Sequence, residues 1–230
     1  MTKPFQLPAF RALALSAVVL TAPLAAQASL TLNIPTNALQ ANAVQAFSED
    51  ALGAFELVGI QVKPLGNATA VAQTNGAFNL PVTSISLQLV KISGGAAIGS
   101  ALEFTRVNED TLQKKRLTLS NFRIDFNTKK VLADAEPAGQ ASRAKTPIFD
   151  FNEQTALALK YRFPLSITAK QVLDKLFLTP EAKAVFMTGL ELPDFVEEVL
   201  NVLDFGTITV DVAVKPRSKP VSTRPYVPAP

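Results

Sequence analysis

Four carboxylates are the side chains of this sequence best suited to catalysis. Asp125, Asp134, Asp150 and Glu153 lie in or beside stretches typical of β-strands. Two carboxylates at the right separation can hydrolyse a glycosidic bond, one as an acid and the other as a base or nucleophile. Sugar-binding sites of secreted glycosidases are usually lined with Trp or Tyr, and this chain has no Trp and two Tyr. A carboxylate-dependent hydrolase is therefore the weakest of three functional hypotheses.

The tripeptide Asp-Phe-Asn occurs twice, at 125–127 and 150–152. Alternating oxygen side chains are ligands for calcium. Each copy supplies only two such side chains, without the Gly and distal Glu of an EF-hand loop. Asx turns at strand ends explain both copies equally well. Calcium therefore remains a minor option, and the sequence assigns no metal-binding residue.

Missing residue types exclude most other chemistry. The chain has no Cys and no His. This excludes zinc sites built on thiolate or imidazole, the usual haem ligands other than Tyr, a Cys nucleophile, a Ser-His-Asp triad and disulfides. We therefore predict a protein that is not an enzyme, with no catalytic, cofactor-binding or metal-binding residue.

The first 28 residues predict a signal peptide. Lys3 and Arg11 precede an uncharged apolar run over 12–25, and the small residues Ala26 and Ala28 follow. This order is typical of a secretory leader. The alternative, a membrane anchor, needs about 20 apolar residues. Cleavage after Ala28 would leave a chain with no transmembrane segment.

Charge divides the chain into a body and a tail. Of 22 Lys and Arg, two lie in the leader and four after residue 214, so residues 29–214 carry 16 basic and 19 acidic residues. Nucleic-acid binding requires a basic patch on the domain itself, so we expect none. Residues 215–230 are rich in Pro and basic residues, which predicts a disordered tail. It is either a frayed terminus or a strip that docks on an acidic surface.

Apolar residues alternate with polar ones along most of residues 29–214, which predicts short strands. We expect turns at 64–67, 94–95 and 127–130, and a bulge at Ser120–Asn121. The expected strands cover 30–34, 60–62, 82–92, 101–107, 116–126, 130–135, 147–151, 156–163 and 207–214. The fold class is therefore mainly β, a single domain built as an antiparallel β-sandwich or open barrel.

A few short helices complete the expected fold. We place them around 39–55, 180–187 and 193–203. Ser48 before Glu49 and Asp50, and Thr179 before Pro180, are typical of helix starts. The two capped blocks resemble each other slightly, which is explained equally well by duplication or by two ordinary helices.

Phenylalanine dominates the aromatic content, with 15 Phe in the chain. Those in predicted strands fall where a β-sheet core would place them. A core of this size is either solid or encloses a lipid-like guest. The composition favours the solid core.

The stretch from Arg116 to Asp134 resembles the strand-turn-strand phrase of HtaA-type domains, with an Asp-x-Asn-Thr turn between two apolar strands. These are exported bacterial surface domains of β-rich build, and some of them bind haem through Tyr and His. This chain has no His, and Tyr161 matches no such motif. The resemblance therefore implies a fold and an exported location, without a cofactor.

Three functions remain as hypotheses. We favour an exported, non-enzymatic structural or interaction module of a Gram-negative cell envelope or surface. It could self-assemble through edge strands at Leu30–Ile34 or Thr207–Val214. The alternative is a periplasmic carrier of a hydrophobic small molecule, and the hydrolase comes third. Periplasm, cell surface and medium are all compatible with the leader.

Overall fold

A single antiparallel sheet forms most of the protein. The computed structural model describes residues 30–33, 40–88, 91–162, 166–213, 217 and 219–229. The predicted signal peptide, 1–28, lies outside these residues. The 12 strands follow the order β1-β6-β7-β8-β9-β10-β11-β12-β2-β5-β4, and β3 also pairs with β7. They are β1 (Leu30–Asn33), β2 (Gln40–Ala46), β3 (Gln61–Gly66), β4 (Thr69–Ala70), β5 (Ala77–Pro81), β6 (Ser84–Gln88), β7 (Lys91–Val107), β8 (Lys114–Asp125), β9 (Lys130–Pro137), β10 (Arg143–Arg162), β11 (Ser166–Leu178) and β12 (Thr207–Ala213).

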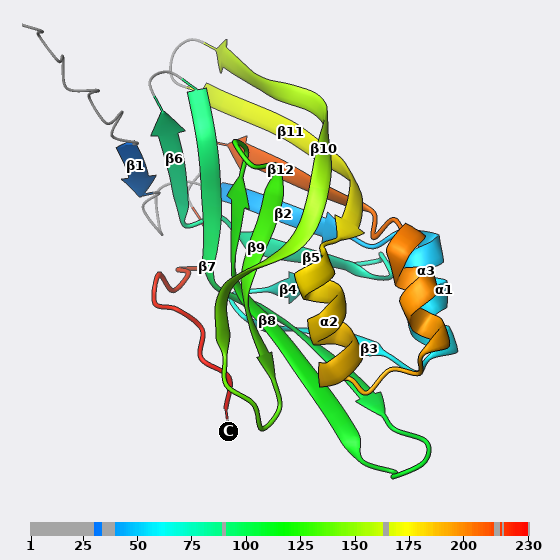
Figure 1. Cartoon of the computed structure of the whole chain (residues 1–230). Coiled ribbons are helices and arrows are strands. Elements are labelled where there is room, and N and C mark those ends of the chain that lie inside the picture. Colours follow the sequence, from blue (N-terminus) through cyan, green and yellow to red (C-terminus); the bar gives the residue numbers. More distant parts are fainter. Residues whose placement is uncertain are drawn as a thin grey trace, which may run out of the picture.

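The sheet curls on itself into an open barrel (Figure 1). Its two ends meet where β5 continues directly into β6. The Val82 amide donates to Ala41 O (2.8 Å) on β2, and the Thr83 amide donates to Ala96 O (2.7 Å) on β7. Two consecutive residues thus tie opposite ends of the sheet together. Of the two predicted architectures, the open barrel is the one observed.

Three short helices gather at one end of the barrel (Figure 1). They are α1 (Glu49–Leu57), α2 (Pro180–Gly189) and α3 (Phe195–Val202). The side chain of Ser48 accepts a hydrogen bond from the Ala51 amide, and Thr179 accepts one from the Ala182 amide. Both predicted caps are therefore confirmed, and they satisfy amides that the first helical turn leaves unpaired.

A buried arginine joins the C-terminal ends of two of these helices. Arg106, on β7, is 6% exposed. Its Nε donates to the carbonyl of Val58, the C-cap of α1, at 2.9 Å. Its Nη1 donates to Glu191 O at 2.8 Å, directly after the C-cap of α2. A cation is favourable at a helix C-terminus, where carbonyls carry partial negative charge.

Phenylalanine rings fill the barrel at this end. Phe104 lies on β7 and is 1% exposed. Its ring centroid lies 5.1 Å from that of Phe186 on α2 and 6.0 Å from that of Phe55 on α1, both edge to face. Edge-to-face pairs at this distance are favourable beyond their buried area. The rings therefore fix α1 and α2 against the sheet.

Several predicted elements were wrong. Residues 40–46 form the strand β2 instead of the start of a helix, because pairing with β12 and β5 outweighs their moderate helix propensity. Gly94 and Gly95 lie inside β7, paired with β8, instead of in a turn. The strands predicted at 147–151 and 156–163 belong to one strand, β10. Strand β11 was not predicted.

Other local predictions are confirmed. The hairpin over 127–130 joins β8 to β9. A register shift follows Ser120, where Asn121 has a φ of 54°, so the predicted bulge is present. The helices predicted at 180–187 and 193–203 correspond to α2 and α3.

The two predicted edge strands have different positions. Strand β1 is the outermost strand at one end of the sheet order. Strand β12 is paired on both sides, with β11 and β2. The prediction that 207–214 is an edge strand was therefore wrong, because β2 covers its second side.

The described part of the tail, 217 and 219–229, lies against the domain (Figure 1). It has neither helix nor strand, as its composition predicts. It differs from the predicted disordered tail because the side chains of Asn67 and Asn121 hydrogen-bond its backbone.

We predict that Arg106→Met destabilises the fold by about 3 kcal/mol, because the carbonyls of Val58 and Glu191 would lose a charged donor in a buried place. Urea unfolding monitored by circular dichroism measures this change. The exposed Arg143 provides the control, and Arg143→Met should change the free energy of unfolding by less than about 0.5 kcal/mol. Equal effects of the two variants would contradict the capping role.

Candidate binding site

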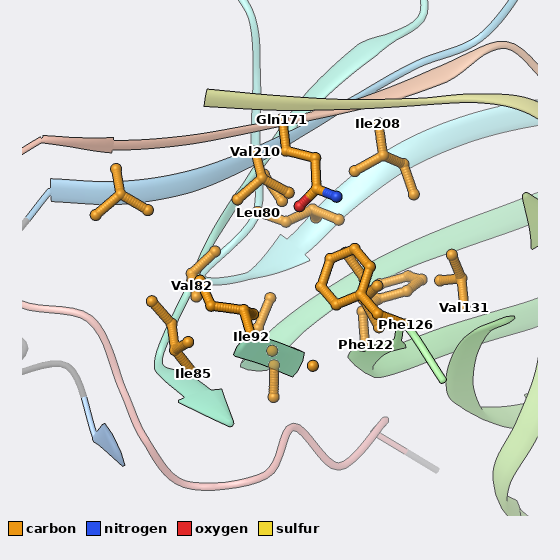
Figure 2. A pocket seen from close by; sticks show the side chains of 17 residues that line it. Leu80, Val82, Ile85, Ile92, Phe122, Phe126, Val131, Gln171, Ile208 and Val210 are labelled. Carbon is orange, nitrogen blue, oxygen red and sulfur yellow. The ribbon is translucent and has the colours of Figure 1, made fainter. Parts of the chain in front are cut away.

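An apolar hollow lies inside the barrel, and Val82 is one of the residues that line it (Figure 2). In the figure, side chains of β11 and β12 point toward those of β8 and of the segment that follows it. The lining residues come from eight strands and the segments next to them. They are Ala43, Leu80, Val82, Ile85, Ile92, Gly94, Gly95, Ala96, Ala97, Phe122, Ile124, Phe126, Val131, Gln171, Ile208, Val210 and Val212.

Strand register explains why these side chains converge. Directly opposed residues of antiparallel strands point to the same face of the sheet. One wall is a row across four strands, and the facing wall is a second row across four others. The first row is Ile85–Gly95–Ile124–Val131. The second row is Gln171–Val210–Ala43–Leu80.

Small residues keep the hollow open. Gly95 takes the place in the first row where a β-branched residue would be usual, and Ala43 lies in the middle of the second row. Ala97, which faces inward with Phe122, is also small. A Cβ atom on Gly95 would have one neighbour within 4 Å, Ser84 O at 3.4 Å, which is an ordinary contact. A side chain could fit there, and its absence leaves space.

The volume of the hollow limits what it can hold. It is about 60 Å³. An apolar protein cavity that binds a benzene ring has a volume of roughly 150 Å³. The hollow therefore suits the end of an apolar chain or a branched alkyl group.

One polar side chain, Gln171, is among the described residues that line the hollow. It is 4% exposed, and its Nε2 donates to Glu153 Oε2 at 3.3 Å. Figure 2 shows the Gln171 amide pointing from β11 into the apolar interior. Ligand pockets are typically apolar with a few such polar groups that orient the ligand.

The Asp-Phe-Asn copies meet around a lysine. Lys130 pairs with Asp125 in the β8–β9 register and with Asp150 in the β9–β10 register. Its Nζ lies 2.6 Å from Asp150 Oδ1. Asp125 Oδ1 accepts from the amides of Asn127 (2.9 Å) and Thr128 (3.3 Å), as an Asx turn does. Asp150 is thus paired with an ammonium group, and Asp125 accepts the amides of its own turn.

The other two carboxylates also have partners of their own. Asp134 accepts from Arg123 Nη1 (3.2 Å), Asn121 Nδ2 (2.9 Å) and the Lys145 amide (2.9 Å). Glu153 is exposed and bonded to Gln171. In the described part of the chain, no three acidic side chains cluster as metal ligands would. The structure does not gather the four carboxylates into one site.

A wider depression of about 800 Å³ lies between α1 and β3. Its lining mixes Glu49, Glu56 and Gln61 with the rings of Phe47 and Phe78. It lacks the uniform apolar wall of the hollow. Tyr161, which we could not assign to a motif, lies in β10.

Sequence reasoning missed the hollow because it placed a turn at Gly94–Gly95. In a β-strand, Gly often marks a place where a ligand or another backbone approaches closely. Gly94 and Gly95 give one example of each, Gly94 of an approaching backbone and Gly95 of space for a ligand. A Cβ on Gly94 would lie 2.5 Å from Ile124 O, so backbone crowds that side, whereas Gly95 faces the hollow. The run of small residues over 94–97 was the available signal.

We predict that Gly95→Val stabilises the protein by about 1–2 kcal/mol, because it fills apolar space and restricts a flexible residue in the unfolded chain. Thermal unfolding of the chain after extraction of apolar ligands measures the change. The matched control is Ser86→Val on the neighbouring strand, where Ser86 pairs with Gly94 on the opposite face. A loss of stability in the extracted Gly95→Val chain would contradict the presence of open space beside Gly95.

None of the described helices is long and apolar enough to cross a membrane.

Comparisons with known proteins give a distant structural likeness. No family model and no curated protein sequence matches the chain. Among solved structures, the chain is similar to the C-terminal domain of HtaA from Corynebacterium glutamicum, with a TM-score of 0.48 and 13% identity. The likeness covers 78% of this chain and 99% of that one. The resemblance to HtaA-type domains is thus confirmed as a distant one.

Proposed function

We propose that this protein is an exported, non-enzymatic module that holds the apolar end of a ligand in the hollow of its barrel. The observation that carries the proposal is the hollow itself. Its two walls converge on space left by Gly95 and Ala43, and Gln171 is its one polar side chain within the described chain. Among the hypotheses drawn from the sequence, this favours the carrier of a hydrophobic molecule, acting as an interaction module of the cell envelope.

The chemistry of the lining defines the ligand class. Val, Ile, Leu and Phe side chains attract hydrocarbon, and burial of apolar surface contributes roughly 25 cal/mol per Å². The small volume accepts a few carbon atoms, so the rest of the ligand would lie outside the hollow. Gln171 could hydrogen-bond one polar atom of that ligand, such as the oxygen of an ester or alcohol. An acyl or branched alkyl chain has these properties.

A binding role also suits the arrangement of the carboxylates. Catalysis of hydrolysis needs at least two titratable groups aimed at one reacting centre. Here Asp125, Asp134 and Asp150 each accept hydrogen bonds from separate partners. Among the residues that the structure describes, no carboxylate lines the hollow. These arrangements support a protein that binds its ligand and does not catalyse a reaction.

Export is part of the proposal because the first 28 residues predict a leader. A chain that passes into the envelope encounters lipids, lipoproteins and other acylated molecules there. The periplasm, the cell surface and the medium are equally compatible with this leader. Strand addition at β1 stays a prediction, since β1 has one partner strand, β6, in the described sheet.

We predict that the purified chain binds a saturated acyl chain, with decanoate as the probe, and that the end of its hydrocarbon chain occupies the hollow. Gly95→Val should weaken probe binding by at least about tenfold, because the new side chain occupies the site. Isothermal titration calorimetry measures both affinities. Native mass spectrometry of the chain as purified should also show a bound apolar molecule.

Ser86→Val is again the matched control, because it adds the same side chain on the outer face and should leave probe binding unchanged. Equal probe affinity in Gly95→Val and the unaltered chain would contradict binding in the hollow. A chain that is purified empty, and whose heat stability does not respond to fatty acids, would remove the proposed function.

A further inference from the structure

Two asparagine side chains hold the C-terminal tail by its backbone. Asn67 Nδ2 donates to Ser222 O (2.7 Å), and Asn67 Oδ1 accepts from the Ser222 amide (3.0 Å). Asn121 Nδ2 donates to Tyr226 O (3.0 Å), and Asn121 Oδ1 accepts from the Tyr226 amide (2.8 Å). Each asparagine side chain thus hydrogen-bonds both the amide and the carbonyl of one tail residue, as a paired strand would.

The surface around these asparagines leaves room for a peptide. A Cβ atom on Gly99 would lie 2.9 Å from Ser222 O and 3.0 Å from Arg224 O. A Cβ on Gly66 would lie 2.8 Å from Cδ2 of the Tyr226 ring. Both glycines have positive φ angles, 81° and 63°, which other residues rarely adopt. We call Gly66, Asn67, Gly99 and Asn121 the tail groove.

Asn121 is built rigidly into this groove. It is 2% exposed and lies at the bulge of β8 with a φ of 54°. Its Oδ1 also accepts from the Gly99 amide (3.1 Å), and its Nδ2 also donates to Asp134 Oδ2 (2.9 Å). The amide is therefore oriented by the domain before a peptide arrives, which lowers the entropy lost on binding.

The tail itself is held at few points. Arg217 Nη2 donates to Ala41 O (2.8 Å) and Val82 O (3.0 Å), and Arg116 Nη2 donates to Ala229 O (3.1 Å). Burial lowers the pKa of the Arg217 guanidinium from its ordinary value. Most described side chains of the tail are exposed. A segment held by backbone contacts and little burial can leave and return.

We propose that the tail groove also binds the tail of a second copy of this chain. Each copy carries both the groove and a tail that fits it, and exchange of an identical segment is a low-cost route to dimers. A tail on its own domain has an effective concentration in the millimolar range. Exchange should therefore become visible at high protein concentration or when one copy's own tail cannot dock.

We test this with the full chain carrying Ser222→Pro and Tyr226→Pro, which removes the two amide donors that the groove accepts. This acceptor chain should bind a synthetic peptide of residues 217–230 at least about tenfold more tightly than the unaltered chain, whose own tail competes. Isothermal titration calorimetry measures both affinities. The side-chain amide signals of Asn67 and Asn121 in an NMR spectrum should shift when the peptide binds.

Two controls assign any binding to the groove. A peptide with the same two prolines should not bind, and Asn67→Leu in the acceptor chain should abolish uptake of the normal peptide. Equal binding of both peptides, or no binding up to about 1 mM, would overturn the proposal.

Association of whole chains distinguishes a second copy from another peptide partner. Sedimentation of the acceptor chain mixed with the unaltered chain should show a mixed dimer, whereas the acceptor chain alone should stay monomeric. Peptide binding without any dimer in the concentrated mixture would contradict the second copy as the partner.

Discussion

A single sheet that closes on itself must fill its interior with the side chains of its own strands, and this constraint governs the whole molecule. At one end, Phe104 and neighbouring rings fill the space and fix α1 and α2. At the other end, the inward positions of β7 and β2 include Gly95 and Ala43, and the space stays open. Protein interiors are otherwise packed as densely as organic crystals. The contrast between the two ends is therefore the main evidence for function.

The end of the barrel that the Phe rings fill is also held by the charged side chain of Arg106, which extends from the sheet to the ends of two helices. Arg106 connects the ends of α1 and α2 across the strand that carries both Phe104 and Gly95. Strand β7 thus joins the rigid end of the barrel to the hollow and to the tail groove at Gly99. Because Thr83 fastens β7 at Ala96 and Ile98, the open end keeps its shape. Both proposed sites are consequently built on fixed backbone.

Local sequence signals predicted the elements that depend on hydrogen bonds between neighbouring residues. Ser48 and Thr179 mark helix starts, and the Asx turn at Asp125 marks a hairpin, because each depends on neighbouring residues. The prediction of a helix over residues 40–46 was wrong because the strands that pair with β2, β12 and β5, lie far away in the sequence. The hollow was missed because Gly94 and Gly95 are usual turn residues, and only strand pairing gives them an inward or outward face. The tail contacts depend on side chains about 105 and 155 residues away, which no local pattern indicates.

The central claim is that an apolar ligand enters the hollow and leaves the filled end unchanged. A methyl-resolved NMR titration with a saturated acyl chain tests it most directly. The methyl signals of Ile85, Ile92, Ile124 and Ile208, which line the hollow, should shift. The signal of Ile148, fully buried and outside that lining, should stay in place. Shifts spread over all isoleucines, or none at saturating ligand, would contradict the account.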